Sequence, residues 1–579
     1  MKASFSSKRF FLIATLSLAA MPYFMKLGSS SLWDSNEAFY AQTPREMIEA
    51  GDFINPTFND QPRFNKPPLV YWVVASFYKV FGVSEGVERI PIALAAVVLI
   101  GTALLLGRAV FSTEAGLMAA IALAATPRFL MFSRRIIIDV YLATFMALAF
   151  LMFVLSEQHL RRRKLCLCLM YVSIGLGILA KGPVAALLPA IVILVYLTVH
   201  RRLSALRELL LPTGLLIIVS IVAPWYATVY VEHGWQYIKS FLLDDNISRY
   251  AFIYRPTGSE AWGPRRSIFF YIPVLAGDLL PWSVFLPFAI WLELRFRFSR
   301  NGAPKTISNG SPHDPSEQGS ESENRSGLLL IWIAVIVLFF SLSRNKEDLY
   351  ILPIYPAAAV LVGGFLVRAW NRDRRRSLSI AMGTAALLVA GMGAALLYVI
   401  HKLSQVYDVA GAQLIGCIAV VGGLCAAAVI SLKRTDVGAV ILALTLAAVN
   451  WVFVLRSLPD FEKYRPVRAL SEVIVANAGP DAKVGYYRTA SPSMVFYLRR
   501  PIFEYYRPEE LSEAMSAGED VYCLMTADDY EAIKDVLAVP TIVLASRPAF
   551  QVKLKGVFDR TKTPQMLLIS NKLGARRSE

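Results

Sequence analysis

Long apolar segments alternate with short polar ones over residues 1–456. A helix of about 20 apolar residues is long enough to cross the hydrocarbon core of a bilayer. The pattern therefore predicts a polytopic α-helical membrane protein with about thirteen transmembrane helices. The segments lie near residues 10–27, 87–107, 115–133, 138–156, 165–180, 184–199, 208–230, 268–294, 327–343, 349–369, 378–400, 410–432 and 437–456.

The pattern changes after residue 456. Short runs of β-branched and aromatic residues, at 483–487 and 521–525, alternate with stretches of helical character at 508–517 and 528–537. Such alternation is typical of a small α/β fold. We therefore expect a membrane domain over residues 1–456 and a small C-terminal α/β domain over residues 457–579.

Basic residues cluster in alternate loops between the apolar runs, as at 161–164. Because cytoplasmic loops are rich in Lys and Arg, this asymmetry predicts a cytoplasmic N-terminus and cytoplasmic loops at 157–164, 200–207, 295–326, 370–377 and 433–435. The first loop, 27–86, and the C-terminal domain then face outward. The stretch 301–326 is rich in Ser, Asn, Gly, Pro and Glu, which predicts a disordered cytoplasmic linker.

Composition supports the membrane interpretation and narrows the function. The chain is 56% hydrophobic and 18% charged, whereas soluble domains have about 25% charged residues. The net charge of +16 follows the loop pattern, so nucleic acid is not an expected partner. The five cysteines and five histidines have no disulfide or metal-ligand spacing. We expect no metal and no cofactor.

The first loop carries acidic, basic and aromatic side chains. Asp34 and Glu37 follow the first apolar run, and the segments 36–50 and 68–81 have the amphipathic pattern of helices lying on a membrane surface. Arg63 and Lys66 lie between these two segments. Polar groups in this position can meet a substrate at the membrane surface.

Short motifs in this loop occur in a recognisable order, with Tyr40-Ala41 followed by 45–47 (Arg-Glu-Met), Gly51-Asp52 and 66–72 (Lys-Pro-Pro-Leu-Val-Tyr-Trp). They resemble the aminoarabinose lipid A transferases and the protein O-mannosyltransferase relatives of the multispanning GT-C class. The resemblance continues in order through 81–83, Glu88-Arg89, Asp139, 181–183, 224–226, Arg249, 280–282, 341–343, Lys346, Tyr350 and Pro353. Each motif is weak alone, but their order and the topology together are fairly specific.

The resemblance implies a GT-C-like fold and an inverting glycosyltransferase. The enzyme would move a sugar from a polyisoprenyl (undecaprenyl) phosphate carrier to a lipid A, glycan, glycolipid or protein acceptor. It also implies a multi-pass protein of the bacterial inner membrane whose C-terminal domain is periplasmic. We expect the lipid bilayer as a partner and a monomeric state.

Two residues depart from the family pattern. Asn36 stands where the family has the Asp of an Asp-Glu pair, and Asn65 stands where it has a Glu before Lys-Pro-Pro. An amide cannot act as a general base. We therefore expect Asp34, supported by Glu37, to activate the acceptor, with Asp139 as the competing candidate for that catalytic role.

The departing phosphate needs a cationic environment. The resemblance implies this role for basic residues of several outer loops, namely Lys66, Arg63, Arg249 and Lys346. Tyr40, Tyr71 and Tyr350 can bind the sugar or line a prenyl groove. Interfacial aromatic residues often serve only as membrane anchors, so this assignment stays open.

Two other classes of function remain. A transporter or flippase of lipid-linked sugars also needs many helices, but no repeat of the first-loop pattern recurs in the second half and few polar residues lie in mid-membrane. A non-catalytic membrane scaffold fits the lost carboxylates at Asn36 and Asn65. Asp34, Lys66, Asp139 and Arg249 argue against the scaffold.

Overall fold

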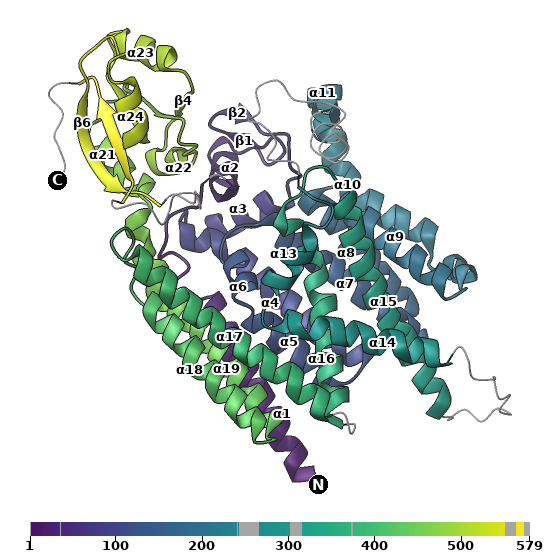
Figure 1. The fold of residues 1–579 in the computed structure, drawn as a ribbon. Coiled ribbons are helices and arrows are strands. Elements are labelled where there is room, and N and C mark those ends of the chain that lie inside the picture. The colour runs from purple at the N-terminus through teal and green to yellow at the C-terminus, as the bar shows by residue number, and fades with distance from the viewer. Residues whose placement is uncertain are drawn as a thin grey trace.

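Most of the predicted apolar runs are helices in the computed structural model, which describes residues 2–34, 36–239, 241, 266–300, 315–371, 375–550 and 563–572. The helices form an elongated bundle beneath a small C-terminal domain (Figure 1). They are α1 (Lys2–Ala20), α4 (Glu85–Val110), α5 (Thr113–Ala125), α6 (Pro127–Phe132), α7 (Ile138–Gln158), α8 (Arg163–Lys181), α9 (Val184–Val199), α10 (Leu211–His233), α11 (Trp235–Ile238), α13 (Tyr271–Asp278), α14 (Leu286–Arg300), α15 (Pro315–Leu342), α16 (Tyr355–Asn371), α17 (Arg375–Leu403), α18 (Ala412–Ser431) and α19 (Thr435–Val452).

Within the described residues, nine helices are long and apolar enough to cross a membrane, or ten if one bent pair counts as a single span. Four shorter apolar helices are also present, at Arg9–Tyr23, Leu69–Phe81, Thr113–Ala125 and Val184–Val199. The predicted multispanning helical fold is confirmed. The predicted number of about thirteen spans is not, because it is reached only if the bent pair and three of the shorter helices also cross.

The apolar run at 268–294 is broken. Helix α13 ends at Asp278, and the chain resumes in a 3-10 turn at Trp282–Phe285 that leads into α14; the two halves are bent by 116°. Pro281 lies at the break, where it can donate no backbone hydrogen bond and its ring obstructs the preceding turn. Hydropathy alone does not reveal such a break.

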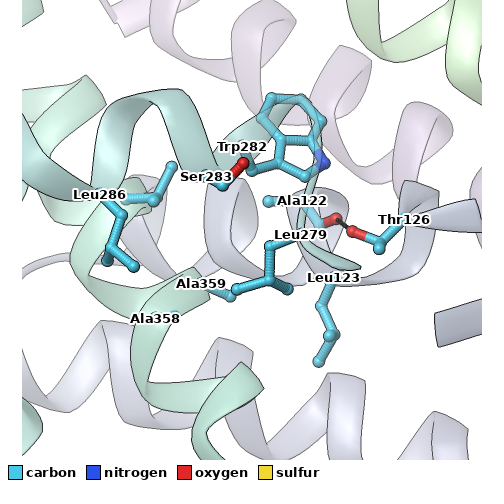
Figure 2. A pocket seen from close by; sticks show the side chains of 10 residues that line it. Ala122, Leu123, Thr126, Leu279, Trp282, Ser283, Leu286, Ala358 and Ala359 are labelled. Atoms are coloured by element: carbon cyan, nitrogen blue, oxygen red, sulfur yellow. Dashed lines mark hydrogen bonds between the residues drawn. The ribbon is translucent and has the colours of Figure 1, made fainter. Parts of the chain in front are cut away.

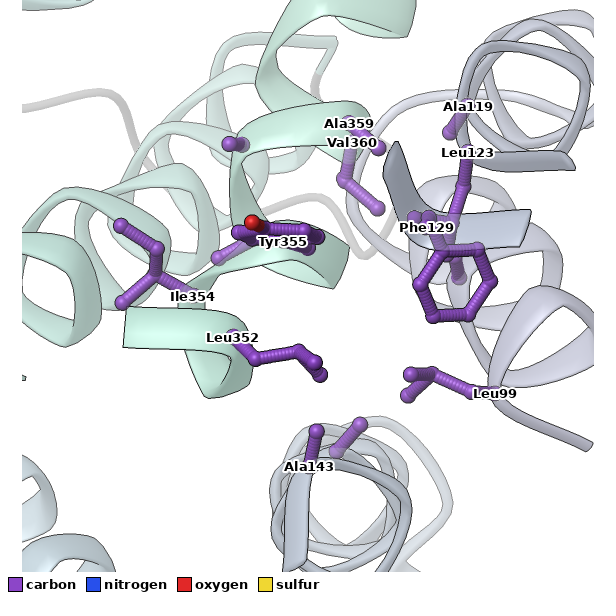
Figure 3. Close-up of a cluster of buried hydrophobic side chains, with 14 of the residues drawn as sticks. Leu99, Ala119, Leu123, Phe129, Ala143, Leu352, Ile354, Tyr355, Ala359 and Val360 are labelled. Atoms are coloured by element: carbon purple, nitrogen blue, oxygen red, sulfur yellow. The ribbon is translucent and has the colours of Figure 1, made fainter. Parts of the chain in front are cut away.

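Helices α4, α5, α6, α7 and α16 meet at the centre of the bundle. Figure 3 shows Leu99, Leu123, Phe129, Ala143 and Tyr355, one from each helix, turned toward a common core. All five side chains are buried. A separate group is formed by α17, α18 and α19 with α1 alongside (Figure 1).

Glycines let the backbones of α4, α5 and α16 come into contact. A Cβ atom placed on Gly116 would lie 2.2 Å from the carbonyl oxygen of Leu104, and one on Gly363 would lie 2.3 Å from that of Ala115. Small residues allow membrane helices to approach closely in this way. Larger side chains at these two positions would force the helices apart.

The first loop folds into two helices and a hairpin. These elements are α2 (Asn36–Ala50), β1 (Thr57–Phe58), β2 (Gln61–Pro62) and α3 (Leu69–Phe81). Asn59 and Asp60 have φ angles of 57° and 59°, as a tight hairpin turn requires. The polar side chains of Glu37, Arg45 and Glu46 on α2 are buried, so protein covers much of the polar face of this helix.

The C-terminal domain contains a five-stranded sheet between helices, as the sequence pattern predicts. Its strands are ordered β4-β3-β5-β7-β6, with β3 parallel to β4 and β5 and with β7 antiparallel to β5 and β6. Leu470 packs on one face of the sheet, and Leu511 and Ile533 pack on the other. The elements are α20 (Leu458–Phe461), α21 (Val467–Asn477), β3 (Lys483–Tyr487), α22 (Met494–Leu498), β4 (Phe503–Tyr505), α23 (Pro508–Ser516), β5 (Val521–Thr526), α24 (Ala527–Ile533), β6 (Ile542–Pro548) and β7 (Gln565–Ser570).

The linker predicted at 301–326 is only partly described. Residues 301–314 lie outside the described residues, whereas residues 315–326 form the first turns of α15 rather than a linker. Pro315 begins this helix, and proline suits the first helical position because its missing N–H would be unpaired there in any case.

Candidate functional site

Glu37 and Arg89 form a buried ion pair at the end of the bundle that faces the C-terminal domain. Both side chains are 1% exposed. Arg89 donates from Nε to Glu37 Oε1 and from Nη2 to Glu37 Oε2, each over 2.8 Å, which is the bidentate geometry of strong guanidinium–carboxylate pairs. Burial alone would raise the pKa of Glu37, but the charge and hydrogen bonds of Arg89 outweigh it and lower that pKa. The predicted catalytic residue Glu37 is therefore fully engaged within the protein.

Arg89 also holds the chain that enters the first loop. Its Nη1 donates to the carbonyl oxygens of Leu27 and Ser30, over 2.7 and 2.8 Å, and its Nη2 donates to that of Ser31 over 2.9 Å. The guanidinium thus uses its fixed fork of donors on α2 and on the preceding turn at once. One side chain of α4 fixes the start of the loop.

The C-terminal domain and the segment that leads to it hold the same turn from the other side. Arg465 donates to the carbonyl oxygens of Ser31, over 2.6 Å, and Leu32. The backbone N–H of Ser31 donates to Glu462 Oε2 over 2.9 Å, and that of Leu32 donates to the hydroxyl of Tyr497 over 2.8 Å. The turn is therefore fixed between α4 and residues more than 400 positions away.

Asp34, the predicted base, is exposed at the end of this turn. Its Oδ1 accepts a hydrogen bond from the backbone N–H of Ser493 over 2.7 Å, and its Oδ2 accepts one from the Ser493 hydroxyl over 2.8 Å. Loss of hydration against the surrounding protein raises the pKa of Asp34 to about 6. The hydrogen bonds from Ser493 and the charge of Arg465 oppose this rise. A carboxylate with a pKa near the working pH suits general-base catalysis.

Helices α2 and α3 bring together the aromatic and basic residues predicted in the first loop. The rings of Tyr40 and Tyr71 stack with centroids 5.4 Å apart. Arg63 donates from Nε to the Tyr71 hydroxyl over 3.2 Å and lies 3.8 Å from the centre of the Phe39 ring. Lys66, on the same segment, donates to the Asn65 carbonyl oxygen over 2.8 Å. Arg63, Tyr40 and Tyr71 thus belong to one local assembly, and Lys66 lies three residues from Arg63 in the same loop.

A second group of predicted residues assembles around Asp139. This residue, in the first turn of α7, is 6% exposed and forms an ion pair with Lys181 at the end of α8. The ammonium of Lys181 lies 5.3 Å from the centre of the Tyr350 ring. Lys346, four residues before Tyr350, is buried and donates to the Ser343 carbonyl oxygen. Residues predicted from separate loops are brought together here, although Lys181 was not predicted as a site residue.

Three residues that the sequence analysis singled out, Arg249, Asn36 and Asn65, are not placed in either of these groups. Arg249 lies outside the described residues. Asn36, the first residue of α2, is exposed, and the side-chain oxygen of Asn65 is buried with no hydrogen-bond partner among the described residues. Within the ranges that the structure describes, no three His, Cys, Asp or Glu side chains are arranged to hold a metal ion.

One partly buried polar cluster was missed by the sequence reasoning. Arg128 of α6 forms ion pairs with Asp278, over 3.4 Å, and Asp348, and the hydroxyl of Tyr355 donates to Asp278 over 2.7 Å. A carboxylate inside the apolar run at 268–294 was the signal that could have found it. A small pocket beside this cluster has an apolar lining that includes Leu123, Leu279 and Trp282 (Figure 2).

Comparison with known proteins gives related sequences. The family described as dolichyl-phosphate-mannose-protein mannosyltransferase matches residues 65–227. An undecaprenyl phosphate-alpha-4-amino-4-deoxy-L-arabinose arabinosyl transferase of Pseudomonas fluorescens is 28% identical over 394 residues, which are 65% of this chain and 60% of that protein. Its counterpart in Pseudomonas aeruginosa strain LESB58 is 29% identical over 389 residues, 64% of this chain and 61% of that protein. Each alignment therefore spans less than two thirds of the relative.

The fold matches over a greater length. The crystal structure of ArnT from Cupriavidus metallidurans bound to undecaprenyl phosphate superposes with a TM-score of 0.75 and 21% identity, covering 98% of this chain and 99% of that one. The structure of the same protein in the apo state gives a TM-score of 0.74. The chain thus has the fold of ArnT and resembles in sequence the aminoarabinose transferases and the protein mannosyltransferase relatives of the GT-C class.

Proposed function

We propose that this protein is a glycosyltransferase that moves a sugar from an undecaprenyl-phosphate carrier to an acceptor at the periplasmic face of the bacterial inner membrane. The observation that carries the proposal is the similarity to aminoarabinose transferases over about two thirds of the chain. The shared first-loop motifs lie on α2 and α3, which are folded against each other through Tyr40 and Tyr71. A lipid A, glycan, glycolipid or protein acceptor is compatible with this chemistry.

The periplasmic orientation of the C-terminal domain belongs to the proposal. Basic residues cluster in the loops that this orientation places in the cytoplasm. The first loop and the C-terminal domain share the hydrogen bonds around Ser31 and Asp34, so both must lie on the same side of the membrane. The carrier phosphate and the acceptor would meet on that side.

Asp34 is the proposed base. Asp34 is an exposed residue whose carboxylate is oriented by Ser493; in the proposed reaction an acceptor hydroxyl gives up its proton to this carboxylate as it attacks the sugar. Asp139 is the alternative. Because that residue is nearly buried and its Oδ1 is engaged by Lys181, an acceptor would have to displace the lysine ammonium to reach it.

Basic residues would stabilise the phosphate as it departs. We assign this role to Lys66, Arg63, Arg249 and Lys346, because charge grows on the leaving phosphate in the transition state and a fixed cation stabilises it. The rings of Tyr40, Tyr71 and Tyr350 would contact the sugar or line a groove for the first part of the prenyl chain. Direct displacement of the phosphate by the acceptor inverts the configuration at the sugar carbon.

A non-catalytic scaffold is the second candidate, favoured by one observation. Asn36 and Asn65 replace two family carboxylates, and Glu37 of the same pair is occupied by Arg89. A scaffold of this kind would still bind the lipid carrier but would transfer nothing.

Incubation of the purified full chain with radiolabelled undecaprenyl-phosphate sugars and a membrane extract tests the proposal. Label should move from the carrier to one extract fraction, and a Lys66→Ala preparation should leave the label on the carrier. Absence of transfer with any donor, by protein that still binds undecaprenyl phosphate, would favour the scaffold.

A further inference from the structure

Two short loops at the end of the bundle away from the candidate site are rich in basic residues. Helix α7 carries Asp139 in its first turn and ends at Gln158, so the loop that follows α7 lies at the other end of the bundle. This loop contains the 3-10 helix η2 (Leu160–Arg162), and the loop between α9 and α10 contains the 3-10 helix η3 (Leu203–Glu208). We call residues 157–164 and 200–208 the loop surface.

Ion pairs join the two halves of the loop surface. Arg202 Nη1 lies 2.8 Å from Glu157 Oε1 at the end of α7, and Arg163 Nη2 lies 2.7 Å from Glu208 Oε2 at the end of η3. Exposed pairs of this kind add little stability. They show, however, that the loops containing η2 and η3 lie side by side and form one surface.

These pairs engage both carboxylates of the loop surface and leave an excess of positive charge. The surface contains seven Lys and Arg residues against the two glutamates. Five of the basic side chains are exposed and form no hydrogen bond or ion pair within the part of the chain that the structure describes, namely Arg161, Arg162, Lys164, Arg201 and Arg207. A surface with an excess of one charge attracts ligands of the opposite charge. The expected ligand is therefore an anion.

Apolar side chains are exposed among these basic residues. Leu160, Leu165, Val199 and Leu203 are between 47% and 73% exposed, and Leu160 and Leu203 begin η2 and η3. Segments that combine exposed apolar side chains with Lys and Arg lie at the boundary between lipid head groups and acyl chains. Nucleic acid offers phosphates but no apolar layer for these four side chains. The combination therefore favours a lipid.

The loop surface also leads into α10, which packs loosely on the bundle. Only 17% of the apolar window of α10 is buried, against 78% for α7. At its start, the hydroxyl of Tyr171 on α8 donates to the Leu209 carbonyl oxygen over 2.7 Å, and a Cβ atom on Gly214 would lie 2.3 Å from the Tyr171 ring. Further along, Trp225 donates to the carbonyl oxygen of Ile54 in the first loop over 2.9 Å. Helix α10 thus connects the loop surface to the first loop.

We propose that the loop surface binds the head group of an anionic glycerophospholipid and that this lipid holds α10 against α8. The guanidinium groups of Arg161, Arg162 and Arg201 can each donate parallel hydrogen bonds to phosphate oxygens. Basic clusters next to spanning helices attract anionic lipids in this way. The bound lipid is neither the donor nor the acceptor of a sugar, so the inference does not depend on the proposed function.

Native mass spectrometry of the purified, delipidated full chain measures binding. The probes are dioleoylphosphatidylglycerol and dioleoylphosphatidylcholine, which share acyl chains and a phosphate but differ in net charge, together with undecaprenyl phosphate. One double variant is Arg161→Gln with Arg162→Gln, and a second is Arg201→Gln with Arg207→Gln. The matched control is Lys433→Gln with Arg434→Gln, which removes two exposed basic residues from another loop that the sequence predicts to be cytoplasmic.

Each loop-surface double variant should bind phosphatidylglycerol about 10- to 30-fold more weakly than the wild type, and the control should bind as the wild type does. Phosphatidylcholine should bind weakly to every form, and undecaprenyl phosphate should bind equally to every form. Phosphatidylglycerol should also raise the thermal unfolding midpoint of the wild type and the control more than that of the two loop-surface variants. Melts without lipid show which variants are folded, and Arg161→Gln alone carries the test if neither double variant folds.

Four results would overturn the inference. Unchanged phosphatidylglycerol binding in the folded loop-surface variants would remove the site. An equal loss in the control would mean that binding follows total charge rather than this surface. Phosphatidylcholine bound as tightly as phosphatidylglycerol would exclude recognition of an anionic lipid. Weaker binding of undecaprenyl phosphate in the loop-surface variants would assign these arginines to the carrier instead.

Discussion

Both carboxylate oxygens of Asp34 accept hydrogen bonds from Ser493, one from its backbone N–H over 2.7 Å and one from its hydroxyl over 2.8 Å. The two residues are 459 positions apart, yet Ser493 fixes the orientation of the carboxylate. The C-terminal domain therefore contributes directly to the shape of the candidate site. With Asp34 as the proposed base, the pH dependence of transfer should therefore respond to a residue outside the membrane domain.

Replacement of Ser493 by alanine should shift the pH profile of transfer. A base works only when ionised, so wild-type activity should fall as the pH drops through the pKa of Asp34, about 6. The hydroxyl stabilises the ionised form, and its removal raises that pKa. The acid limb of kcat/KM against pH should therefore move to higher pH in Ser493→Ala and stay in place in Ser493→Thr. Identical profiles in all three proteins would separate Ser493 from the titration of the base.

Arg89→Gln should destabilise the protein strongly. The substitution leaves the Glu37 carboxylate buried without its counter-charge, and breaking a buried ion pair in this way costs about 3–5 kcal/mol. The thermal unfolding midpoint of the purified variant reports the loss. The double variant Glu37→Gln, Arg89→Gln should recover part of the stability, because no uncompensated charge remains. A double variant no more stable than Arg89→Gln would mean that the loop carbonyls, not Glu37, are the main partners.

Lys66→Ala should abolish most sugar transfer while leaving expression and folding intact. The lysine is half-buried in the first loop, and a cation near the departing phosphate acts mainly in the transition state. Measured kcat should therefore fall with little change in the unfolding temperature. Lys79→Ala is the matched control, because Lys79 is an exposed lysine at the end of α3. Near-normal turnover in Lys66→Ala would exclude this lysine from the site.

Gly116→Val should destabilise the bundle where α4 meets α5. A Cβ atom on Gly116 lies 2.2 Å from the Leu104 carbonyl oxygen and 2.9 Å from the Arg108 nitrogen, so the backbones must move apart, which typically costs about 1–3 kcal/mol or more. Unfolding in detergent measures the effect. Gly101→Ala, in the facing helix α4, has no atom within 4 Å of its new Cβ and should be tolerated. Equal stability of the two variants would contradict the close approach.

The fold was largely predictable because hydropathy is a local signal. Apolar runs identified most of the helices, and the β-branched run at Lys483–Tyr487 identified a central strand of the C-terminal sheet. The break at Pro281 was missed because apolar residues flank it on both sides, so the hydropathy signal continues across it. Strand β7 was missed because it pairs with β5 on one side and with β6 on the other. No local pattern encodes these long-range pairings.

The candidate site was less predictable than the fold, because its contacts join residues that are far apart in the sequence. The family motifs singled out Glu37 and Glu88-Arg89 separately but did not reveal that Glu37 pairs with Arg89, 52 positions away. The motifs likewise gave no sign that Asp139 pairs with Lys181, 42 positions away. Pairings of this kind depend on how helices pack, so they become visible only in three dimensions.

Sugar transfer by Asp34→Asn, compared with Asp139→Asn, tests the central claim most directly. With Asp34 as the base, Asp34→Asn should lower the transfer rate about 10²–10⁴-fold, the usual contribution of a general base. Asn36→Asp should then be tolerated, and Asp139→Asn should have a milder effect through Lys181. Full activity in Asp34→Asn together with loss of activity in Asp139→Asn would contradict the account and transfer the role of base to Asp139.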